Sequence, residues 1–382
     1  MNYRFHLLGF PHTATNREYN ACAYTAKILK FIKMMAPRGH DIIHYGNEGS
    51  DVSCEHVQVL SEEERASWFG THDRQRLYDL KWDINMPYWK LFNQRCIELL
   101  QSRVQKGDFI LSLAGACHKP IADAFPGSAS GVVTGPWFVE YGIGYYGTFS
   151  RYRIYESQTH REWCHGRVNS TYEDNDDTVV HNYFDLDDFH PDLVMKGRSM
   201  VSEYANYYVF VGRIIHSKGW RVAVETTRDL GARLVLVGQG DPGPLEHHVK
   251  RFGHATIEQR AALFGNAIAS FAPTHYREPF GGVAVESQLC GTPCITTDHG
   301  AFVETVEPRF RCASHREFVE AAKLASELEP MEREAIRQSA IKRWSLESIA
   351  PQYERYFARL HSRWGEGWYE MRPPELVRIP NV

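Results

Sequence analysis

The sequence predicts a chain of two α/β domains, each built on a parallel sheet with helices on both sides. The length of 382 residues is too great for one ordinary hydrophobic core and suits two domains of roughly 150–200 residues each. Short apolar runs at 207–212, 233–238 and 294–297 show no alternation, which is typical of strands buried on both faces. Helical patterns separate these runs, and strand–helix–strand order at this spacing indicates parallel strands.

The second half of the chain contains the clearest elements. A weaker strand is expected at 269–273, between the apolar runs named above. The spacing of apolar residues predicts the intervening helices, at 219–230, 257–267, 282–290 and 316–328.

The first half predicts a similar plan. A strand at 5–9 leads through a polar loop into a helix at 18–35, which the Pro37-Arg-Gly-His40 sequence ends. Further strands are expected at 41–45, 109–113 and 131–133, whereas the polar, charged stretch 47–82 cannot be assigned to an element.

The domain boundary is expected at a hinge near 185–192. The run 179–189 is predicted to be the last strand of the first domain and its exit. One apolar face with steps of three and four predicts a long C-terminal helix that reaches back to the first domain; its residues are Leu346, Ile349, Tyr353, Phe357, Leu360 and Trp364. We therefore expect a first domain of residues 1–187 with the tail 362–382, and a second domain of residues 188–361.

Composition argues against several classes of protein. The net charge of −4 gives no general attraction to nucleic acid or to anionic membranes. No apolar run approaches the ~20 residues of a membrane-spanning helix, and the N-terminal run is too short for a signal peptide. The eight cysteines are scattered without paired spacing, and the 19 histidines form no ligand pattern. We expect a soluble, cytoplasmic protein without a metal ion and without a nucleic-acid partner.

Two glutamates eight positions apart, Glu278 and Glu286, flank a Pro-Phe-Gly-Gly turn at the start of a predicted helix. Gly281 and Gly282 let the backbone approach a ligand, and a helix N-terminus favours an anion such as a diphosphate. Glu278 can face a sugar over the helix end, and Glu286 can accept hydrogen bonds from a ribose diol. A capped helix with a solvated glutamate at each end remains the alternative.

Two cations, Arg213 and Lys218, lie five positions apart in the turn after the strand at 207–212. Such turns lie at the carboxyl edge of an open α/β sheet, where ligands bind. An arginine fork together with a lysine suits a diphosphate, and a solvated basic loop is the alternative. The loop 238–241 is a second, less specific turn at a strand end.

Together these residues resemble the family 4 glycosyltransferases, a retaining group with the GT-B fold. In that fold two Rossmann-like domains face each other across a cleft that holds the active site, and a C-terminal helix crosses back to the first domain. The resemblance covers residues 207–306. It is carried by Gly212 with Arg213, Lys218 with Gly219, the loop 238–241, the E-x7-E pair, and the sequence from Glu286 to Pro293. Near the hinge, Asn182-Tyr-Phe-Asp185 is similar to the family's Asn-Gly-x-Asp, with Tyr183 in place of the usual glycine.

The resemblance implies a nucleoside-diphosphate sugar as donor, no separate cofactor, and an acceptor hydroxyl on a glycan, glycolipid or small molecule. Arg213 and Lys218 would neutralise the diphosphate. Glu278 would contact the donor sugar beside the anomeric carbon, and Glu286 would bind the ribose. Further donor contacts would come from Gly212, Gly240, Ala255, Phe280, Gly281, Gly282 and Val283.

The first domain matches the family less well. The resemblance implies that Gly9 approaches the diphosphate and that His118 contacts the donor sugar, with a surface histidine at a helix start as the alternative. Residues 140–147, rich in glycine and tyrosine, either line the acceptor side or form an irregular surface loop, which we favour. Lys27, Lys30 and Lys33 fall on one side of the first helix. A membrane-binding face is one interpretation of these lysines, but we favour a solvated face.

The predicted activity is metal-independent, retaining transfer of a hexose-type sugar. Because one fold supports several reactions, an inactive sugar-nucleotide-binding subunit, a nucleotide-sugar epimerase and a phosphorolytic enzyme are the alternatives. The presence of Glu278, Arg213 and Lys218 favours the transferase. An epimerase would be expected to show a set of carboxylate bases, and none is clear in the sequence.

Overall fold

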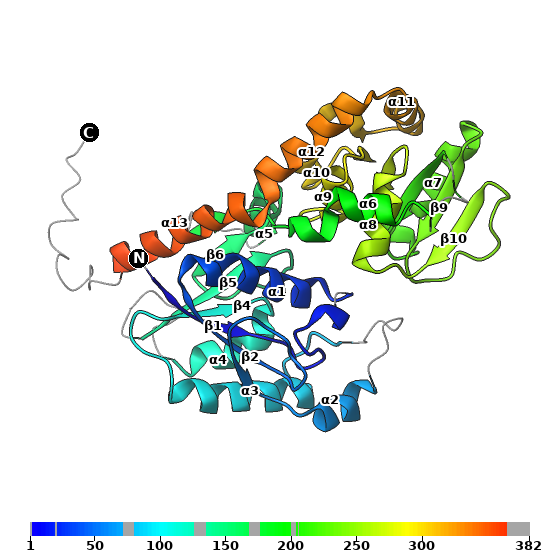
Figure 1. Ribbon diagram of the computed structural model, residues 1–382. Helices are drawn as coiled ribbons and strands as arrows, with labels where there is room; N and C mark the ends of the chain where they lie inside the picture. The colour runs from blue at the N-terminus through cyan, green and yellow to red at the C-terminus, as the bar shows by residue number, and fades with distance from the viewer. Residues whose placement is uncertain are drawn as a thin grey trace, which may run out of the picture. The chain divides into compact units, whose positions relative to one another are not determined.

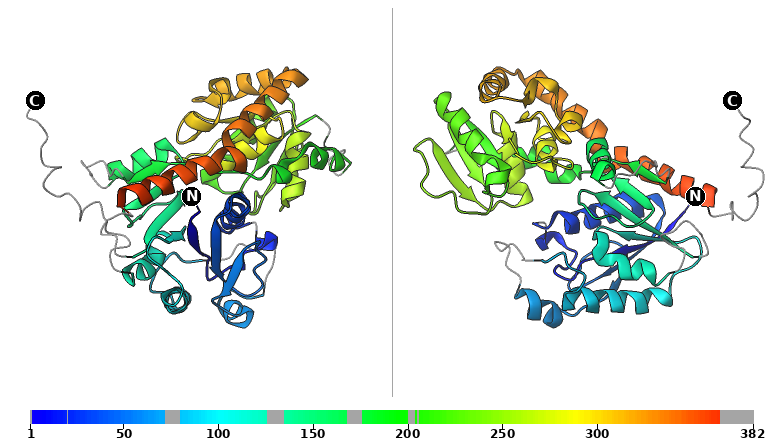
Figure 2. Two further views of the ribbon diagram at one scale, coloured as in Figure 1. Left: turned by 60° about the vertical axis from the view of Figure 1, so that its left-hand side comes forward. Right: turned by 180° about the vertical axis from the view of Figure 1, so that it is seen from behind.

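The computed structural model describes residues 2–19, 21–71, 80–125, 135–167, 176–199, 204 and 206–364. The chain forms two compact units, each with a parallel sheet flanked by helices, as the sequence predicts (Figure 1, Figure 2). The first unit comprises Met1–Tyr155, Ser170–Val180 and Ala350–Val382. The second comprises Glu156–Asn169 and His181–Ile349.

The first unit contains a seven-stranded parallel sheet in the order β3-β2-β1-β4-β5-β6-β7. Its strands are β1 (Arg4–Leu8), β2 (Asp41–Gly46), β3 (Glu55–Gln58), β4 (Phe109–Ser112), β5 (Trp137–Ile143), β6 (Tyr152–Tyr155) and β7 (Asp177–Val179). Its helices are α1 (Ala23–Met35), α2 (Glu62–Phe69), α3 (Pro87–Gln101) and α4 (Lys119–Asp123).

The prediction for this unit is correct for β1, β2 and β4 and incomplete elsewhere. The predicted strand 131–133 lies outside the described residues. The run 179–189 is mostly not a strand, because β7 ends at Val179 and Leu186–Phe189 is a 3-10 helix. The polar stretch for which no element was predicted contains β3 and α2.

The second unit contains a six-stranded parallel sheet in the order β10-β9-β8-β11-β12-β13. Its strands are β8 (Tyr207–Val211), β9 (Arg233–Val237), β10 (Val249–Gly253), β11 (Ser270–Ala272), β12 (Cys294–Thr297) and β13 (Arg311–Cys312). Its helices are α5 (Gln158–Arg167), α6 (Pro191–Lys196), α7 (Trp220–Asp229), α8 (Ile257–Gly265), α9 (Gly282–Leu289), α10 (Phe302–Thr305), α11 (His315–Ser326) and α12 (Pro330–Trp344).

Strand β8 explains why the apolar runs of this half do not alternate. Tyr208 and Phe210 pack into a core with residues of α7 and α11. Tyr207 and Val209, which point to the other face, pack into a second core with residues of α8. Since both faces of the strand are buried, both sets of positions must be apolar.

The last helix, α13 (Leu346–Trp364), passes from the second unit into the first at Ala350. Within the first unit, Phe357 packs against Phe5 of β1 with ring centroids 4.8 Å apart, and Tyr353 packs against Phe31 of α1 at 5.6 Å. These aromatic contacts agree with the division at Ala350. The division expected from sequence differs here, and also at 156–169 and 181–187, which lie in the second unit.

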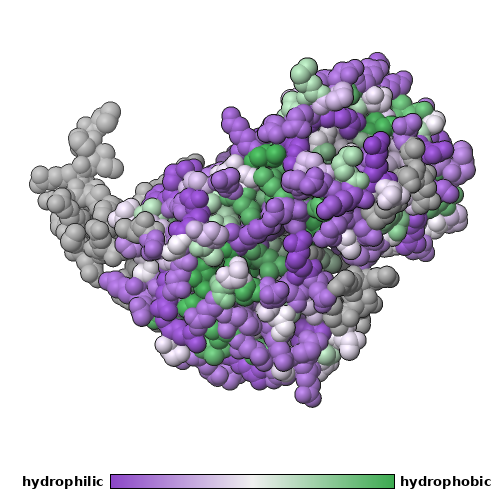
Figure 3. All heavy atoms as spheres, in the orientation of Figure 1, coloured by the Kyte–Doolittle hydropathy of each residue, from purple (hydrophilic) through white to green (hydrophobic). Residues whose placement is uncertain are grey.

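The molecular face shown in Figure 3 is largely hydrophilic, with apolar side chains in smaller patches. In the part of the chain that the structure describes, none of the helices combines the length and the hydropathy needed to cross a membrane.

The solvated lysine face that we expected on α1 is wrong for Lys27. Its side chain is buried, and its Nζ donates to the carbonyl of Gly142 at 3.0 Å and lies 5.2 Å from the ring centroid of Tyr24. Lys30 is partly buried, and only Lys33 is exposed. Burial lowers the pKa of Lys27 to about 7, since the protein interior disfavours the charged form.

Replacing Lys27 by Met is predicted to stabilise the protein most at pH 7 and below, where the buried lysine is protonated. Between pH 7 and 10.5 the unfolded chain holds a proton that the folded protein has released, so the stability of the unaltered protein rises with pH. The advantage of Lys27→Met should therefore shrink by about 1.4 kcal/mol per pH unit in this window. Urea unfolding at pH 7 and 9 measures the difference in the free energy of unfolding between Lys27→Met and the unaltered protein. Lys33→Met is the exposed control. An equal effect of Lys27→Met at both pH values contradicts the assignment.

Candidate functional site

The loops after β8 and β9 lie side by side at the carboxyl edge of the second sheet. The N–H of Gly212 donates to the carbonyl of Val237 at 2.9 Å, and the N–H of Ile214 donates to Gln239 at 2.7 Å. Gly240 follows directly, and its carbonyl accepts a hydrogen bond from Arg251 at 2.6 Å. The structure thus brings together two of the predicted donor-binding glycines, Gly212 and Gly240, on adjacent strand ends.

Arg213 and Lys218 have different surroundings although they belong to one loop. Arg213 is exposed, and its side chain makes no hydrogen bond or ion pair with the described residues. The Nζ of Lys218 lies 2.7 Å from the Oε1 of Glu278 and also donates to the hydroxyl of Tyr276, whose ring centroid is 4.9 Å away. The side chains of Lys218 and Glu278 are only 21% and 13% exposed, so the two charges neutralise each other in a partly desolvated position.

The fold places Lys218 beside Glu278 by packing one loop against another. Gly219 is the N-cap of α7 with a φ of 69°, and a Cβ there would lie 1.8 Å from the carbonyl oxygen of Pro273. The N–H of His275 donates to the carbonyl of Ser217 at 2.9 Å. The loop after β8 therefore lies directly on the loop after β11, which carries Glu278. Only glycine permits this approach at position 219.

The turn before α9 is supported from the loop after β12. Gly281 is the N-cap of α9 with a φ of 80°, and a Cβ there would lie 2.4 Å from the ring of Phe302. The N–H of Ala301 donates to the carbonyl of Glu278 at 2.9 Å. Phe280 is buried, while Gly282 and Val283 are partly exposed. The first N–H groups of α9 have no partner within the helix, so this turn presents hydrogen-bond donors and a positive dipole end.

Glu286 is held by a residue that the sequence analysis missed. Arg260 of α8 donates through Nε to Oε2 of Glu286 at 3.0 Å and through Nη2 to Oε1 at 3.2 Å. The side chains of Glu286 and Arg260 are 17% and 19% exposed. Each carboxylate oxygen keeps a second lone pair, so Glu286 can still accept hydrogen bonds from hydroxyl groups. The two residues are 26 positions apart, and no local sequence pattern links them. For this reason the sequence did not predict the contact of Arg260 with Glu286.

Ala255 lies just before α8 and is buried. Among the described residues, no group of three or more His, Cys, Asp or Glu side chains is arranged to hold a metal ion.

The predicted residues of the first unit, Gly9 and His118, have structural roles that the sequence did not reveal. The N–H of Gly9 donates to the carbonyl of Tyr45 at 2.7 Å and so ties the end of β1 to β2. His118 is fully buried, which corrects the alternative of a surface histidine. Its Nδ1 lies 2.9 Å from the hydroxyl of Ser112.

His118 lies among aromatic rings, which explains its electrostatics. Phe92 stacks against it at a centroid distance of 6.0 Å, and Trp89 meets it edge-on at 5.4 Å. Burial lowers the pKa of His118 to about 3, so the ring is neutral near pH 7. Its Nε2 has no hydrogen-bond partner among the described residues.

The irregular surface loop that we favoured for residues 140–147 is wrong for the first part of this segment. Glu140 belongs to β5 and is fully buried, and its Oε2 accepts the N–H groups of Phe149 at 2.9 Å and Ser150 at 2.8 Å. Burial raises the pKa of Glu140 to about 7, although these hydrogen bonds oppose the shift.

Sequence comparisons match part of the chain to known proteins. Residues 197–343 match the family model of the glycosyl transferases group 1. The glycogen synthase of Mycobacterium tuberculosis is 33% identical over 113 residues, which cover 26% of this chain and 27% of that protein. The matched stretch thus spans little more than a quarter of this relative's length.

Solved structures extend the likeness to both units. The catalytic domain of starch synthase IV from Arabidopsis thaliana, bound to ADP and acarbose, has a TM-score of 0.70 at 13% identity, covering 95% of this chain and 100% of that chain. Anabaena HepE, in complex with UDP and glucose, has a TM-score of 0.61 at 15% identity, covering 94% and 100%. The chain therefore has the GT-B fold, and its residues 197–343 match the model of the glycosyl transferases group 1.

Proposed function

We propose that the protein is a retaining glycosyltransferase that moves a sugar from a nucleoside diphosphate to an acceptor hydroxyl without a divalent metal. The observation that carries the proposal is the Lys218–Glu278 pair at 2.7 Å, in the loops after β8 and β11. The matched relatives support it, because one is a glycogen synthase and another a 2-deoxystreptamine N-acetyl-D-glucosaminyltransferase. HepE was solved with UDP and glucose, and the starch synthase with ADP, which favours a nucleoside diphosphate as the leaving group.

The proposed catalysis is mainly electrostatic. Breaking the bond to the anomeric carbon leaves positive charge on the sugar and negative charge on the departing diphosphate. Glu278 would stabilise the sugar, whereas Lys218, the exposed Arg213 and the N-terminus of α9 would stabilise the diphosphate. Since these groups supply the positive charge that a metal supplies in other transferases, the proposal needs no divalent cation. Backbone of the 253–256 loop would lie along the base, and Glu286 would bind the ribose.

The proposed stereochemistry is retention at the anomeric carbon. The acceptor oxygen attacks on the face from which the diphosphate leaves, and the departing phosphate oxygen takes the acceptor's proton. An inverting route needs a general base on the opposite face. The carboxylate of Glu278 is engaged by the ammonium group of Lys218, an arrangement that suits charge stabilisation better than proton abstraction.

Replacing Arg213 or Lys218 by Ala is predicted to reduce the rate of sugar transfer by a factor of about 100 or more, because each removes a preorganised charge that stabilises the leaving group. The rate of nucleoside diphosphate release measures the effect, with the donor base first chosen by thermal shift with UDP, ADP, GDP and dTDP. Lys323→Ala, an exposed cation on α11, is the matched control and should leave the rate unchanged. Near-normal rates in both Arg213→Ala and Lys218→Ala would show that the phosphate site is wrongly assigned.

An α-configured donor is predicted to give an α-linked product in excess EDTA. Proton NMR of the first product formed, recorded before any anomeric equilibration, distinguishes the two linkages. A β-linked product would refute the retaining mechanism. If transfer is lost in EDTA and is restored by manganese or magnesium, the proposal of metal independence is refuted.

A further inference from the structure

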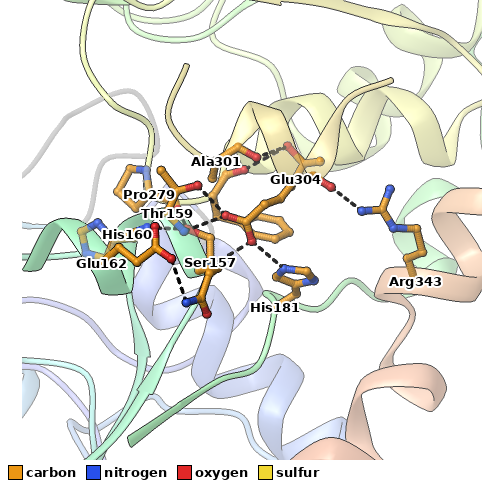
Figure 4. Close-up of polar contacts among 12 residues, drawn as sticks. Ser157, Thr159, His160, Glu162, His181, Pro279, Ala301, Glu304 and Arg343 are labelled. Atoms are coloured by element: carbon orange, nitrogen blue, oxygen red, sulfur yellow. Dashed lines mark hydrogen bonds and ion pairs between the residues drawn. The ribbon is translucent and has the colours of Figure 1, made fainter. Parts of the chain in front are cut away.

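Glu304 of α10 connects separate segments of the second unit through its carboxylate (Figure 4). Its Oε1 accepts the backbone N–H of Thr159 at 2.8 Å and the hydroxyl of Thr159 at 2.6 Å. Its Oε2 accepts the backbone N–H of Gln158 at 2.9 Å and lies 3.2 Å from Nε2 of His181. With a side chain that is 19% exposed, this one carboxylate satisfies donors from the start of α5 and from the segment at His181.

The position suits a negative charge in particular. Gln158 and Thr159 open α5, and the N–H groups of a first helical turn have no partner within the helix. A carboxylate there is stabilised by the helix dipole as well as by hydrogen bonds. Burial alone would raise the pKa of Glu304, but the hydrogen bonds from His181 and from Thr159 and Gln158 outweigh it and lower the pKa to about 2. Glu304 is therefore ionised at any physiological pH.

The segments that Glu304 connects also hold the backbone of the turn that begins at Glu278. Ala301, in the loop that leads into α10, donates its N–H to the carbonyl of Glu278 at 2.9 Å. Ser157, next to α5, donates its hydroxyl to the carbonyl of Pro279 at 2.6 Å. Figure 4 shows Ser157 and Pro279 beside the carboxylate of Glu304. The first two carbonyls of the turn are thus fixed from two sides.

Phe280 completes this set of contacts. Its ring lies 5.9 Å, centroid to centroid, from the ring of His181. Its carbonyl accepts the hydroxyl of Thr305, the neighbour of Glu304, at 3.4 Å. Arg343 of α12 also donates to the backbone carbonyl of Glu304, so the helix that carries the carboxylate is itself held in place.

We propose that Glu304 is a positioning residue for sugar transfer, which holds the Glu278–Phe280 turn in its donor-binding conformation by tying α10 to α5 and His181. The inference rests on the proposed function, because the turn must hold a donor for its position to matter. Residues 157–159 and His181 lie outside the stretch 197–343 that matches the family. The support for the turn therefore includes parts of this chain that the family model does not describe.

The test distinguishes the use of the whole donor in sugar transfer from the binding of its nucleoside diphosphate alone. Glu304→Gln keeps the shape of the side chain but removes its charge and places an amide N–H₂ against N–H donors. We expect kcat to fall at least tenfold and the donor KM to rise, whereas the Kd of the free nucleoside diphosphate changes by a smaller factor, because Arg213, Lys218 and Glu286 are themselves unchanged. Thr159→Val removes one hydrogen bond and keeps the charge, so it should change kcat and KM in the same direction by a smaller factor.

The matched control is Glu317→Gln on α11. Glu317 also accepts hydrogen bonds beside a helix start, from the N–H of Ala313 at 2.7 Å and the hydroxyl of Ser314 at 3.1 Å, but it has no contact with the turn. The Glu317→Gln variant should have a slightly lower Tm and an unchanged kcat and donor KM.

Two results would overturn the proposal. In the first, Glu304→Gln or, if that variant does not fold, Thr159→Val keeps the kcat and donor KM of the unaltered protein. In the second, Glu304→Gln loses nucleotide binding and transfer in equal proportion, which indicates only a loss of folded protein. An unaltered protein that binds nucleotide and transfers no sugar contradicts the proposed function itself, and with it any role of Glu304 in transfer.

Discussion

The ion pair between Lys218 and Glu278 joins two loops of the second unit, and the rest of the candidate site is arranged around it. The residues are 60 positions apart, and their side chains meet at 2.7 Å because the loops after the adjacent strands β8 and β11 lie against each other. Two partly desolvated charges are costly unless they are paired. The pairing therefore lets the protein keep a carboxylate and an ammonium group ready where, in the proposed reaction, positive and negative charge develop together.

The parts of this site that the sequence predicted share a local signature. Arg213 and Lys218 follow a strongly apolar strand, and the glutamates of the E-x7-E pair flank a Pro-Phe-Gly-Gly turn, so short stretches of sequence locate them. The strands of the second unit were equally clear, because β8 is buried on both faces and carries an uninterrupted apolar run. In the strands, local pattern and tertiary packing agree, and the prediction is confirmed there. The roles of the site residues stay predictions.

The features that the sequence did not reveal depend on contacts between distant residues. Arg260 pairs with Glu286 from another helix, and Glu304 accepts hydrogen bonds from residues 145 positions earlier in the chain. Lys27 was expected on a solvated face, but its stem passes into the core and its ammonium group reaches Gly142. Helical spacing cannot distinguish a lysine that covers the surface from one that is buried by a neighbouring strand. The burial of His118 was not predicted for a similar reason, since it comes from the rings of Phe92 and Trp89 on another helix.

We propose that the donor diphosphate binds at the loops that carry Arg213, Lys218 and the start of α9. A crystal structure of the protein with its preferred nucleoside diphosphate tests this most directly. We predict phosphate oxygens within hydrogen-bond distance of the Arg213 guanidinium and the Lys218 Nζ, next to the N–H groups of Gly281 and Gly282, with the ribose hydroxyls on Glu286. A nucleotide bound elsewhere, with Arg213 still without a partner and Lys218 engaged only by Glu278 and Tyr276, would contradict it.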